Sequence, residues 1–357
     1  MKIAIDCRHL YSSGIGSYLK GCLPYFLNSD NDFILLCNYN NLFNIKNHKN
    51  AKIISCSVKP FSLKDTFFFP KKIIKEINSC NFFFSPYFNI SNGIKIPIFT
   101  TIHDIIFPDM PELTSFLGLK ARMYFYKRCF RLSKKIFTVS NFSKTRINLY
   151  SKNLKPVIVT YNASQSYFHL KNNYNGKSIK KEYILFIGNI KKHKGLDYFL
   201  DAYYEAIKNG LKHKLIIVGN ADNFRSKYSD FQNKLKLFKD GEVTFSGYLS
   251  DDKLANLLSE ASLLVQPSLY EGFGLPPLEA LNSGTLALIS DIPVFREIYN
   301  GFPVVFFKAG DTTDLKNKLL LILLNNKAQK ISIPEELQNK YTFEKTANII
   351  LNEILCG

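Results

Sequence analysis

The chain has 357 residues, 46% of them apolar and 21% charged, a composition that excludes intrinsic disorder and, at about 150 residues per domain, predicts two folded domains. Its net charge of +18 is distributed unevenly along the chain: Lys and Arg outnumber Asp and Glu by 23 to 8 over residues 1–165 but only by 24 to 21 over the remainder. The basic first half can therefore face nucleic acid, an anionic membrane or a phosphorylated substrate. Asp6 and Arg8 interrupt the apolar start that a secretory signal needs, and no apolar run reaches the roughly 18 residues of a membrane span. The seven cysteines are scattered and form no C-x-x-C pair. They therefore argue against a disulfide framework or a zinc module and favour a reducing cytoplasm.

Short apolar runs rich in β-branched and aromatic residues alternate with longer stretches of helical spacing, such as residues 196–209. Most runs are continuously apolar, which is typical of strands buried on both faces of a parallel sheet, and the repeated order predicts an α/β chain with two doubly wound domains. A polar, Asn-rich stretch at 164–181 predicts a linker, so we expect domains at 1–165 and 166–340 and a last helix at 341–357. The predicted strands are residues 3–7, 33–38, 52–58, 81–85, 96–103, 136–140, 157–161, 183–188, 214–219, 243–247, 263–267, 286–290 and 304–307.

In open α/β sheets, ligands bind beyond the carboxyl ends of the strands, and polar motifs follow four of the predicted strands. Gly14 and Gly16 follow the first strand, ahead of a helix expected to begin near Ser17. Glycines there let the backbone approach an anion, although a plain strand-to-helix turn explains them equally well. His103 closes the fifth strand, where a histidine can donate a hydrogen bond or a proton to a substrate or, more commonly for a single histidine, bond to a backbone carbonyl.

The third motif follows the first strand of the second half. Asn189 comes just after that strand, and residues 191–194 (KKHK) place concentrated positive charge before a helix that we expect to begin near Gly195. Positive charge beside a helix N-terminus suits a diphosphate. Solubilising surface lysines are the alternative interpretation.

The fourth motif is the most specific. Glu271 lies on a loop with Gly272 and Gly274, and Glu279 comes eight residues after Glu271, about one turn into a helix opened by two prolines. Glu271 can accept hydrogen bonds from sugar hydroxyls, and Glu279 can accept two from a ribose diol. The preference of acids for helix N-termini is the structural alternative, but it does not explain why the loop needs two glycines and two prolines together.

Together these motifs resemble the family-four retaining glycosyltransferases of the GT-B fold, the group that builds bacterial O-antigen and capsular polysaccharides. The stretch E-G-F-G-L-P-P-L-E resembles that family's two-glutamate donor motif, and D-x-R-x-L…G-I-G-x-Y, H-D…P-E, T-V-S-x-x-S and G-N-x-x-x-x-K-G match in order over nearly the whole chain. The resemblance implies two Rossmann-like domains that face each other across a cleft, with the donor mainly on the C-terminal domain and the acceptor mainly on the N-terminal one. It also implies that the last helix crosses back to the first domain, although an ordinary last helix of the second domain fits the sequence nearly as well.

The resemblance also implies a role for each matching residue. Lys194 would hold the donor diphosphate, with His193 beside it where the family often has an arginine. Glu279 would bind the ribose, and Gly16 would present backbone amides to the diphosphate. His103 would face the transferred sugar. The predicted catalytic residues are His103, Lys194 and Glu271, and the predicted donor-binding residues are Gly14, Gly16, Asn189, His193, Lys194, Glu271, Gly272, Phe273, Gly274, Leu275 and Glu279.

The activity that the resemblance implies is retaining transfer of a hexose, for which mannose is one candidate, from a nucleoside-diphosphate sugar to a lipid-linked saccharide in surface polysaccharide synthesis. Departure of the nucleoside diphosphate builds negative charge on its β-phosphate, which Lys194, the glycine-loop amides and the helix dipole can stabilise. No D-x-D cluster follows a strand, so we expect no metal and no cofactor, the nucleotide sugar being a substrate. A same-face return mechanism is the family expectation, and the identity of any nucleophile stays open.

Two other hypotheses remain open: a GT-B-like nucleotide-sugar epimerase, and a basic protein that binds membranes or nucleic acid without catalysis. A nicotinamide oxidoreductase is disfavoured because the third fingerprint glycine is missing. For the transferase we expect a cytoplasmic location, peripheral on the inner face of the membrane, and no nucleic-acid partner. Residues 116–135 carry seven Lys or Arg interleaved with aromatic residues; they predict a helix that rests on an anionic leaflet or, equally, a core-packing helix with a solvated basic face.

Overall fold

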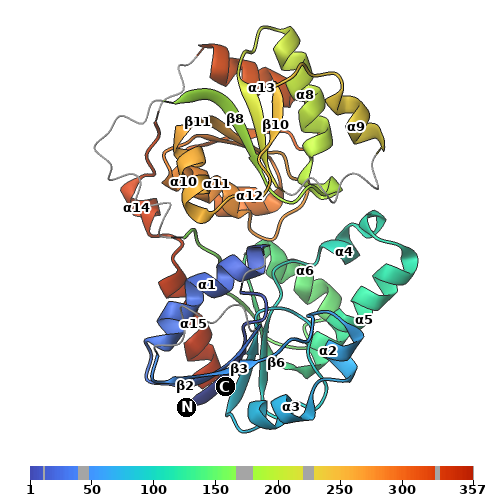
Figure 1. Cartoon of the computed structure of the whole chain (residues 1–357), viewed down its shortest axis with the longest axis vertical. Coiled ribbons are helices and arrows are strands. Elements are labelled where there is room, and N and C mark those ends of the chain that lie inside the picture. Colours follow the sequence, from blue (N-terminus) through green and yellow to red (C-terminus); the bar gives the residue numbers. More distant parts are fainter. Residues whose placement is uncertain (11–12, 39–47, 166–179, 220–228, 326–329, 357) are drawn as a thin grey trace. The chain divides into compact units, whose positions relative to one another are not determined.

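The computed structural model describes residues 1–10, 13–38, 48–165, 180–219, 229–325 and 330–356, which form two compact units (Figure 1). Unit 1 comprises Met1–Ala163 together with Tyr341–Gly357, and unit 2 comprises Ser164–Lys340. Most of the linker predicted at 164–181 lies outside the described residues. Each unit has its own sheet and its own core.

Unit 1 is built on a seven-stranded parallel sheet. Its strands are β1 (Lys2–Asp6), β2 (Asp32–Cys37), β3 (Ala51–Ser55), β4 (Phe82–Ser85), β5 (Ile98–Thr101), β6 (Ser133–Thr138) and β7 (Val157–Val159). Its helices are α1 (Ser13–Leu27), α2 (Leu63–Phe67), α3 (Lys71–Ile77), α4 (Ile106–Asp109), η2 (Pro111–Leu113), α5 (Phe116–Leu132), α6 (Asn141–Ser151) and α15 (Phe343–Leu355). The strand order β3-β2-β1-β4-β5-β6-β7 reverses between β1 and β4, which is where this fold class gathers its ligand loops.

Unit 2 is built on a six-stranded parallel sheet. Its strands are β8 (Lys181–Ile187), β9 (Lys214–Val218), β10 (Val243–Phe245), β11 (Ala261–Gln266), β12 (Ala287–Ser290) and β13 (Val304–Phe307). Its helices are η4 (Lys192–Lys194), α8 (Leu196–Lys208), α9 (Ser229–Leu235), α10 (Asp251–Glu260), α11 (Leu275–Asn282), α12 (Pro293–Ile298), α13 (Thr312–Asn325) and α14 (Glu335–Gln338). The strand order β10-β9-β8-β11-β12-β13 reverses between β8 and β11.

The predicted α/β class is confirmed, and all thirteen predicted strands are present in order. Two helix boundaries were wrong. The first helix begins at Ser13, not near Ser17, so Gly14 and Gly16 lie in its first turn; glycine is needed at position 16 because a Cβ there would lie 2.8 Å from the carbonyl oxygens of His9 and Leu10 in the preceding loop. The basic helix ends at Leu132, and the next residues begin strand β6.

The last helix, α15, packs on α1 in unit 1. Ala347, Ile350, Leu351 and Ile354 are buried, and they are the residues of the apolar stripe seen in the sequence. Gly21 of α1 allows the close approach, since a Cβ there would lie 2.3 Å from ring carbons of Phe343 on α15. Among the described residues, no helix has both the length and the apolar character needed to cross a bilayer.

Candidate functional site

Two loops of unit 2 meet at the reversal point of its sheet. One follows β8 and contains η4, and the other follows β11 and leads into α11. Because β8 and β11 are adjacent parallel strands, their carboxyl ends lie at the same edge of the sheet. Leu269 N–H donates a 2.7 Å hydrogen bond to the carbonyl of His193, so the backbones of the two loops are joined directly.

Gly195 makes this approach possible. Its φ of +70° lies in the left-handed region that favours glycine, and a Cβ there would lie 1.9 Å from the carbonyl oxygen of Pro267 and 2.5 Å from the ring of Tyr198. The Tyr198 hydroxyl donates to the same Pro267 carbonyl. The glycine that ends η4 therefore fixes the distance between the loop that carries Lys194 and the loop that carries Glu271.

Lys194 and Glu271 form a bidentate ion pair. The Lys194 Nζ lies 2.7 Å from Glu271 Oε1 and 2.8 Å from Oε2. Glu271 Oε1 also accepts hydrogen bonds from the Ser268 hydroxyl at 2.7 Å and from Gln266 Nε2 at 3.2 Å. Burial alone would raise the pKa of Glu271, but the charge and hydrogen bond of Lys194, with that of Ser268, lower it. Glu271 is thus held ionised.

Glu271 has three donors, Lys194, Ser268 and Gln266, of which only Lys194 is indicated by the sequence. Ser268 and Gln266 stand out in the sequence only as polar residues at the end of an apolar strand. Their relevance depends on side-chain direction, which the sequence does not give. The polar residues at the end of that strand are the feature of the sequence that could have indicated these two donors.

His193 and Asn189, the other predicted donor-binding residues of the first loop, have different environments. His193 is buried, and its Nδ1 has no hydrogen-bond partner within the described part of the chain. Burial, reinforced by the neighbouring Lys194 charge, lowers the pKa of His193 to about 4, so the ring is neutral at pH 7. Asn189 is exposed. The positive charge of this loop next to Glu271 therefore comes from Lys194.

The glycine loop is fastened to the start of α11. Gly274 has a φ of +83°, and a Cβ there would lie 2.3 Å from the Phe295 ring. The Tyr299 hydroxyl donates to the Gly274 carbonyl and accepts from Leu278 N–H at 3.1 Å. Within the described residues, the N–H groups of Gly274 and Leu275 have no acceptor. These two amides are available to an anion at the helix N-terminus. The preceding residues, Gly272 and Phe273, are buried.

Glu279 differs from Glu271 in having no partner. Its side chain is buried on α11, and among the described residues its carboxyl group makes no hydrogen bond or ion pair. Burial, with a smaller contribution from Asp251, raises the pKa of Glu279 to about 8. A buried carboxyl group without a donor is costly unless a ligand supplies one. Perturbed carboxyl groups of this kind gather at functional sites.

His103, Gly14 and Gly16 belong to unit 1. His103 Nε2 lies 2.9 Å from the carbonyl of Pro86, and its ring packs edge-on against Tyr18 at 5.0 Å. Burial lowers the pKa of His103 to about 4, so this ring is neutral and Nε2 carries the proton that it donates to Pro86. Gly14 is exposed on α1 with open space around it, whereas Gly16 is buried against the preceding loop.

A buried charged cluster at the end of β1 was not predicted. Arg8 donates to Asp6 Oδ1 at 2.9 Å and to Asp65 Oδ1 at 2.8 Å, and Tyr87 hydroxyl donates to Asp6 Oδ2 at 2.5 Å. The His9 ring packs edge-on against Tyr87 at 4.5 Å. The cluster thus fixes the loop after β1 to the loop after β4 at the reversal point of the first sheet. The feature of the sequence that could have indicated this cluster is the D-x-R pair at the end of an apolar strand.

Residues 171–337 match the family described as glycosyl transferases group 1. The matched region is just under half of the chain. The match takes in both loops that meet at the edge of the second sheet. Among the described residues, no three His, Cys, Asp or Glu side chains are grouped so that they could hold a metal ion.

Bacterial proteins named for O-antigen synthesis are similar to part of this chain. It is 33% identical over 206 residues to the O-antigen chain mannosyltransferase RfbU of Salmonella typhimurium, covering 56% of this chain and 53% of the relative. It is 28% identical over 214 residues to O-antigen chain mannosyltransferase B of Escherichia coli, covering 56% of this chain and 54% of that protein. The chain thus spans about half the length of these relatives.

Solved structures share the fold of this chain. The structure of HepE from Anabaena in complex with UDP-glucose has a TM-score of 0.75 and 15% identity, with full coverage of both chains. The lipopolysaccharide outer core galactosyltransferase WaaB has a TM-score of 0.63 and 15% identity, covering 99% of this chain and 100% of WaaB. These likenesses establish the GT-B fold.

Proposed function

We propose that this protein is a retaining hexosyltransferase, with mannose as the first candidate sugar, that uses a nucleoside-diphosphate donor and a lipid-linked saccharide acceptor in O-antigen synthesis. The observation that carries the proposal is the arrangement of two glutamates in unit 2. Glu271 is ionised and held by Lys194 at the reversal point of the sheet, and Glu279 is buried without a donor in the following helix. The hydroxyl groups of such a donor supply the hydrogen-bond donor that Glu279 lacks, and its diphosphate supplies the acceptor that the nearby amides lack.

The choice of donor is supported by the relatives and neighbours. Both O-antigen relatives are named mannosyltransferases, and the Anabaena neighbour was solved with UDP-glucose. We therefore assign the diphosphate to Lys194 and to the free amides of Gly274 and Leu275. Glu279 accepts hydrogen bonds from the ribose diol, and Glu271 from the hydroxyls of the transferred sugar.

The proposed chemistry is charge stabilisation at the leaving group. When the bond between the anomeric carbon and the β-phosphate oxygen breaks, negative charge grows on that phosphate. The ammonium of Lys194 and the α11 amides are fixed before the reaction, so they stabilise this charge without a cost in reorganisation. No step requires a metal ion. In unit 1, His103 is assigned to the transferred sugar, which it would contact as a neutral ring.

The test is a transfer assay with GDP-mannose, UDP-glucose and UDP-galactose, each with and without an extract of lipid-linked saccharides. We expect acceptor-dependent release of a nucleoside diphosphate from one donor, with the sugar attached in the anomeric configuration that it had in the donor. Conversion of a donor to its epimer without acceptor would replace the transferase by an epimerase. Inversion at the anomeric carbon would contradict the retaining assignment.

A further inference from the structure

The outward side of helix α5 is both apolar and basic. The exposed positions on this side carry large apolar side chains and cations. They are Phe116, Leu117, Lys120, Tyr124, Lys127 and Arg131, and from Leu117 on they are spaced three or four residues apart. Phe116 is 69% exposed, Leu117 is 75% exposed and Tyr124 is 49% exposed. The whole helix contains no acidic residue. A surface helix of a soluble domain normally shows polar residues on this side.

The opposite side of α5 accounts for the packing of the helix. Tyr126, Cys129 and Phe130 are buried in the core of unit 1. Two arginines are also held by the protein: Arg122 stacks on the Phe107 ring at 4.0 Å, and Arg128 donates to the Ile90 carbonyl. The exposed apolar residues are therefore not needed to hold the helix in place.

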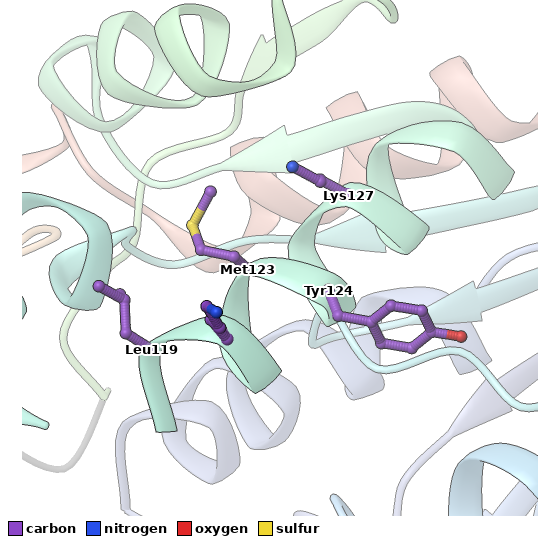
Figure 2. A pocket seen from close by; sticks show the side chains of 5 residues that line it. Leu119, Met123, Tyr124 and Lys127 are labelled. Atoms are coloured by element: carbon purple, nitrogen blue, oxygen red, sulfur yellow. The ribbon is translucent and has the colours of Figure 1, made fainter. Parts of the chain in front are cut away.

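The cations of the outward side remain available. In the part of the chain that the structure describes, Lys120, Lys127 and Arg131 make no ion pair. Lys120 Nζ lies 4.3 Å from the centroid of the Phe116 ring, so cation and aromatic side chain lie next to each other. Leu119 and Met123 line a hollow of about 330 Å³ with Lys120, Tyr124 and Lys127 (Figure 2).

Helix α2 extends the same surface. The Phe67 ring lies 6.4 Å from the Tyr124 ring, which places α2 beside α5. Leu63 is 69% exposed and Phe68 is 73% exposed, and the intervening Lys64 is exposed as well. The α2–α5 surface comprises the exposed residues Leu63, Lys64, Phe67 and Phe68, from α2 and the residue that caps it, together with Phe116, Leu117, Lys120, Tyr124, Lys127 and Arg131 from α5, and thus joins large apolar side chains with cations.

We infer that the α2–α5 surface docks unit 1 on an anionic lipid bilayer. Exposed Leu and Phe side chains next to Lys and Arg match both layers of a membrane interface, because the apolar groups enter the boundary of the acyl chains and the cations contact the lipid phosphates. A nucleic acid would use the cations but offers nothing to aliphatic side chains such as Leu63 and Leu117. This inference goes beyond the proposed function and does not depend on it, since docking needs neither donor nor acceptor.

The absence of tryptophan from the chain makes a direct test possible. Phe116→Trp introduces the only tryptophan of the chain on the α2–α5 surface, where it can be excited selectively over tyrosine, and Leu154→Trp introduces one at a 65% exposed position elsewhere on unit 1. With vesicles of phosphatidylglycerol and phosphatidylcholine, we expect the Phe116→Trp emission to shift to the blue and to be quenched by brominated acyl chains. The Leu154→Trp emission should stay unchanged, and pure phosphatidylcholine vesicles should leave both unchanged.

Charge substitutions test the electrostatic part by vesicle flotation. Lys120→Gln/Lys127→Gln/Arg131→Gln should lower the affinity for anionic vesicles by roughly a hundredfold, at about fivefold for each cation near the surface. The matched triple variant of exposed cations in unit 2, Lys212→Gln/Lys214→Gln/Lys239→Gln, should bind like the wild type. Both variants should keep the wild-type melting temperature. Membrane docking by this surface would be overturned by an equal loss of vesicle affinity in the two triple variants or by equal binding of the wild type to neutral vesicles. It would also be overturned if the emission of both tryptophans, or of neither, shifted with anionic vesicles, or if duplex DNA displaced the vesicles.

Discussion

At the scale of single residues, the two glutamates of unit 2 have the same side chain and opposite electrostatics. Glu271 has three donors and a lowered pKa, whereas Glu279 has none and a pKa raised to about 8. The difference comes from their neighbours, because both carboxyl groups are buried. Each state gives a separate prediction about stability and activity.

Glu279→Gln should stabilise the protein and weaken nucleotide binding. Folded Glu279 keeps its proton up to about pH 8, whereas the unfolded side chain loses it above its ordinary value of 4.5, so the stability of the wild type falls as pH rises between these values. The substituted amide has no charge to bury, and the variant should gain roughly 3 kcal/mol at pH 7, decreasing to nothing near pH 4.5. Thermal unfolding across this pH range measures the gain. If the gain in stability of the variant over the wild type were no larger at pH 8 than at pH 5, the raised pKa of Glu279 would be contradicted.

Lys194→Ala should lower kcat more than it raises KM, because the phosphate charge that Lys194 opposes grows in the transition state. It should also destabilise unit 2 by on the order of 2 kcal/mol, since Glu271 is left buried without its cation. The double variant Lys194→Ala/Glu271→Gln serves as the control: it should regain stability in thermal unfolding but no turnover. A loss confined to KM would remove Lys194 from the chemical step.

At the scale of elements, the site depends on how closely two loops approach. Gly195 ends η4 against the carbonyl of Pro267, and Gly274 begins α11 against Phe295. Both residues have positive φ and both lack room for a Cβ. The sequence therefore uses glycine for two reasons at once: backbone conformation and close packing.

Gly195→Ala should separate the loops that carry Lys194 and Glu271. A Cβ 1.9 Å from the Pro267 oxygen forces the backbone to move, in addition to the cost of roughly 1–2 kcal/mol for a left-handed alanine. Gly210→Ala is the matched control, because Gly210 has a φ of +96° and nothing within 4 Å of its Cβ position. Calorimetric titration with nucleoside diphosphates should show lost binding for the first variant and retained binding for the second. Similar binding by both would show that the contact with Pro267 does not position the site.

Helix α15 should stabilise unit 1 through its buried side. Ile350→Ala removes a fully buried side chain and should cost about 2–5 kcal/mol, whereas Ile349→Ala, at a position 36% exposed, should cost far less. Denaturant unfolding followed separately for the two variants measures the difference. Equal stabilities would mean that α15 does not contribute to the core of unit 1.

Much of this architecture follows from local sequence patterns, and the remainder depends on packing. Continuous apolar runs predicted most of the described strands, because burial on both faces leaves no polar alternation. The sequence places the start of α1 four residues too late, because glycines are typical of loops and the close contact of Gly16 is not visible in the sequence. The donors on Glu271 and the hydroxyl of Tyr299 were missed because their roles depend on which side chains the fold brings together.

At the scale of the whole molecule, two α/β units divide the charge and the chemistry of the chain. The excess of basic residues lies before residue 165, and the α2–α5 surface belongs to that half. The paired and unpaired glutamates lie in unit 2, within the region matched by the group 1 glycosyltransferases. We therefore expect salt to weaken vesicle binding strongly while leaving nucleotide binding in unit 2 much less affected.

Donor binding by Lys194, Glu271 and Glu279 is tested most directly by measuring acceptor-dependent sugar transfer by the wild type beside the Glu279→Gln and Lys194→Ala/Glu271→Gln variants. With GDP-mannose and lipid-linked saccharide, we predict transfer by the wild type, a rise in donor KM of about tenfold or more for the first variant, and loss of turnover for the second although it remains folded. Wild-type rates in both folded variants would contradict this donor site, because they would place the donor away from Lys194, Glu271 and Glu279.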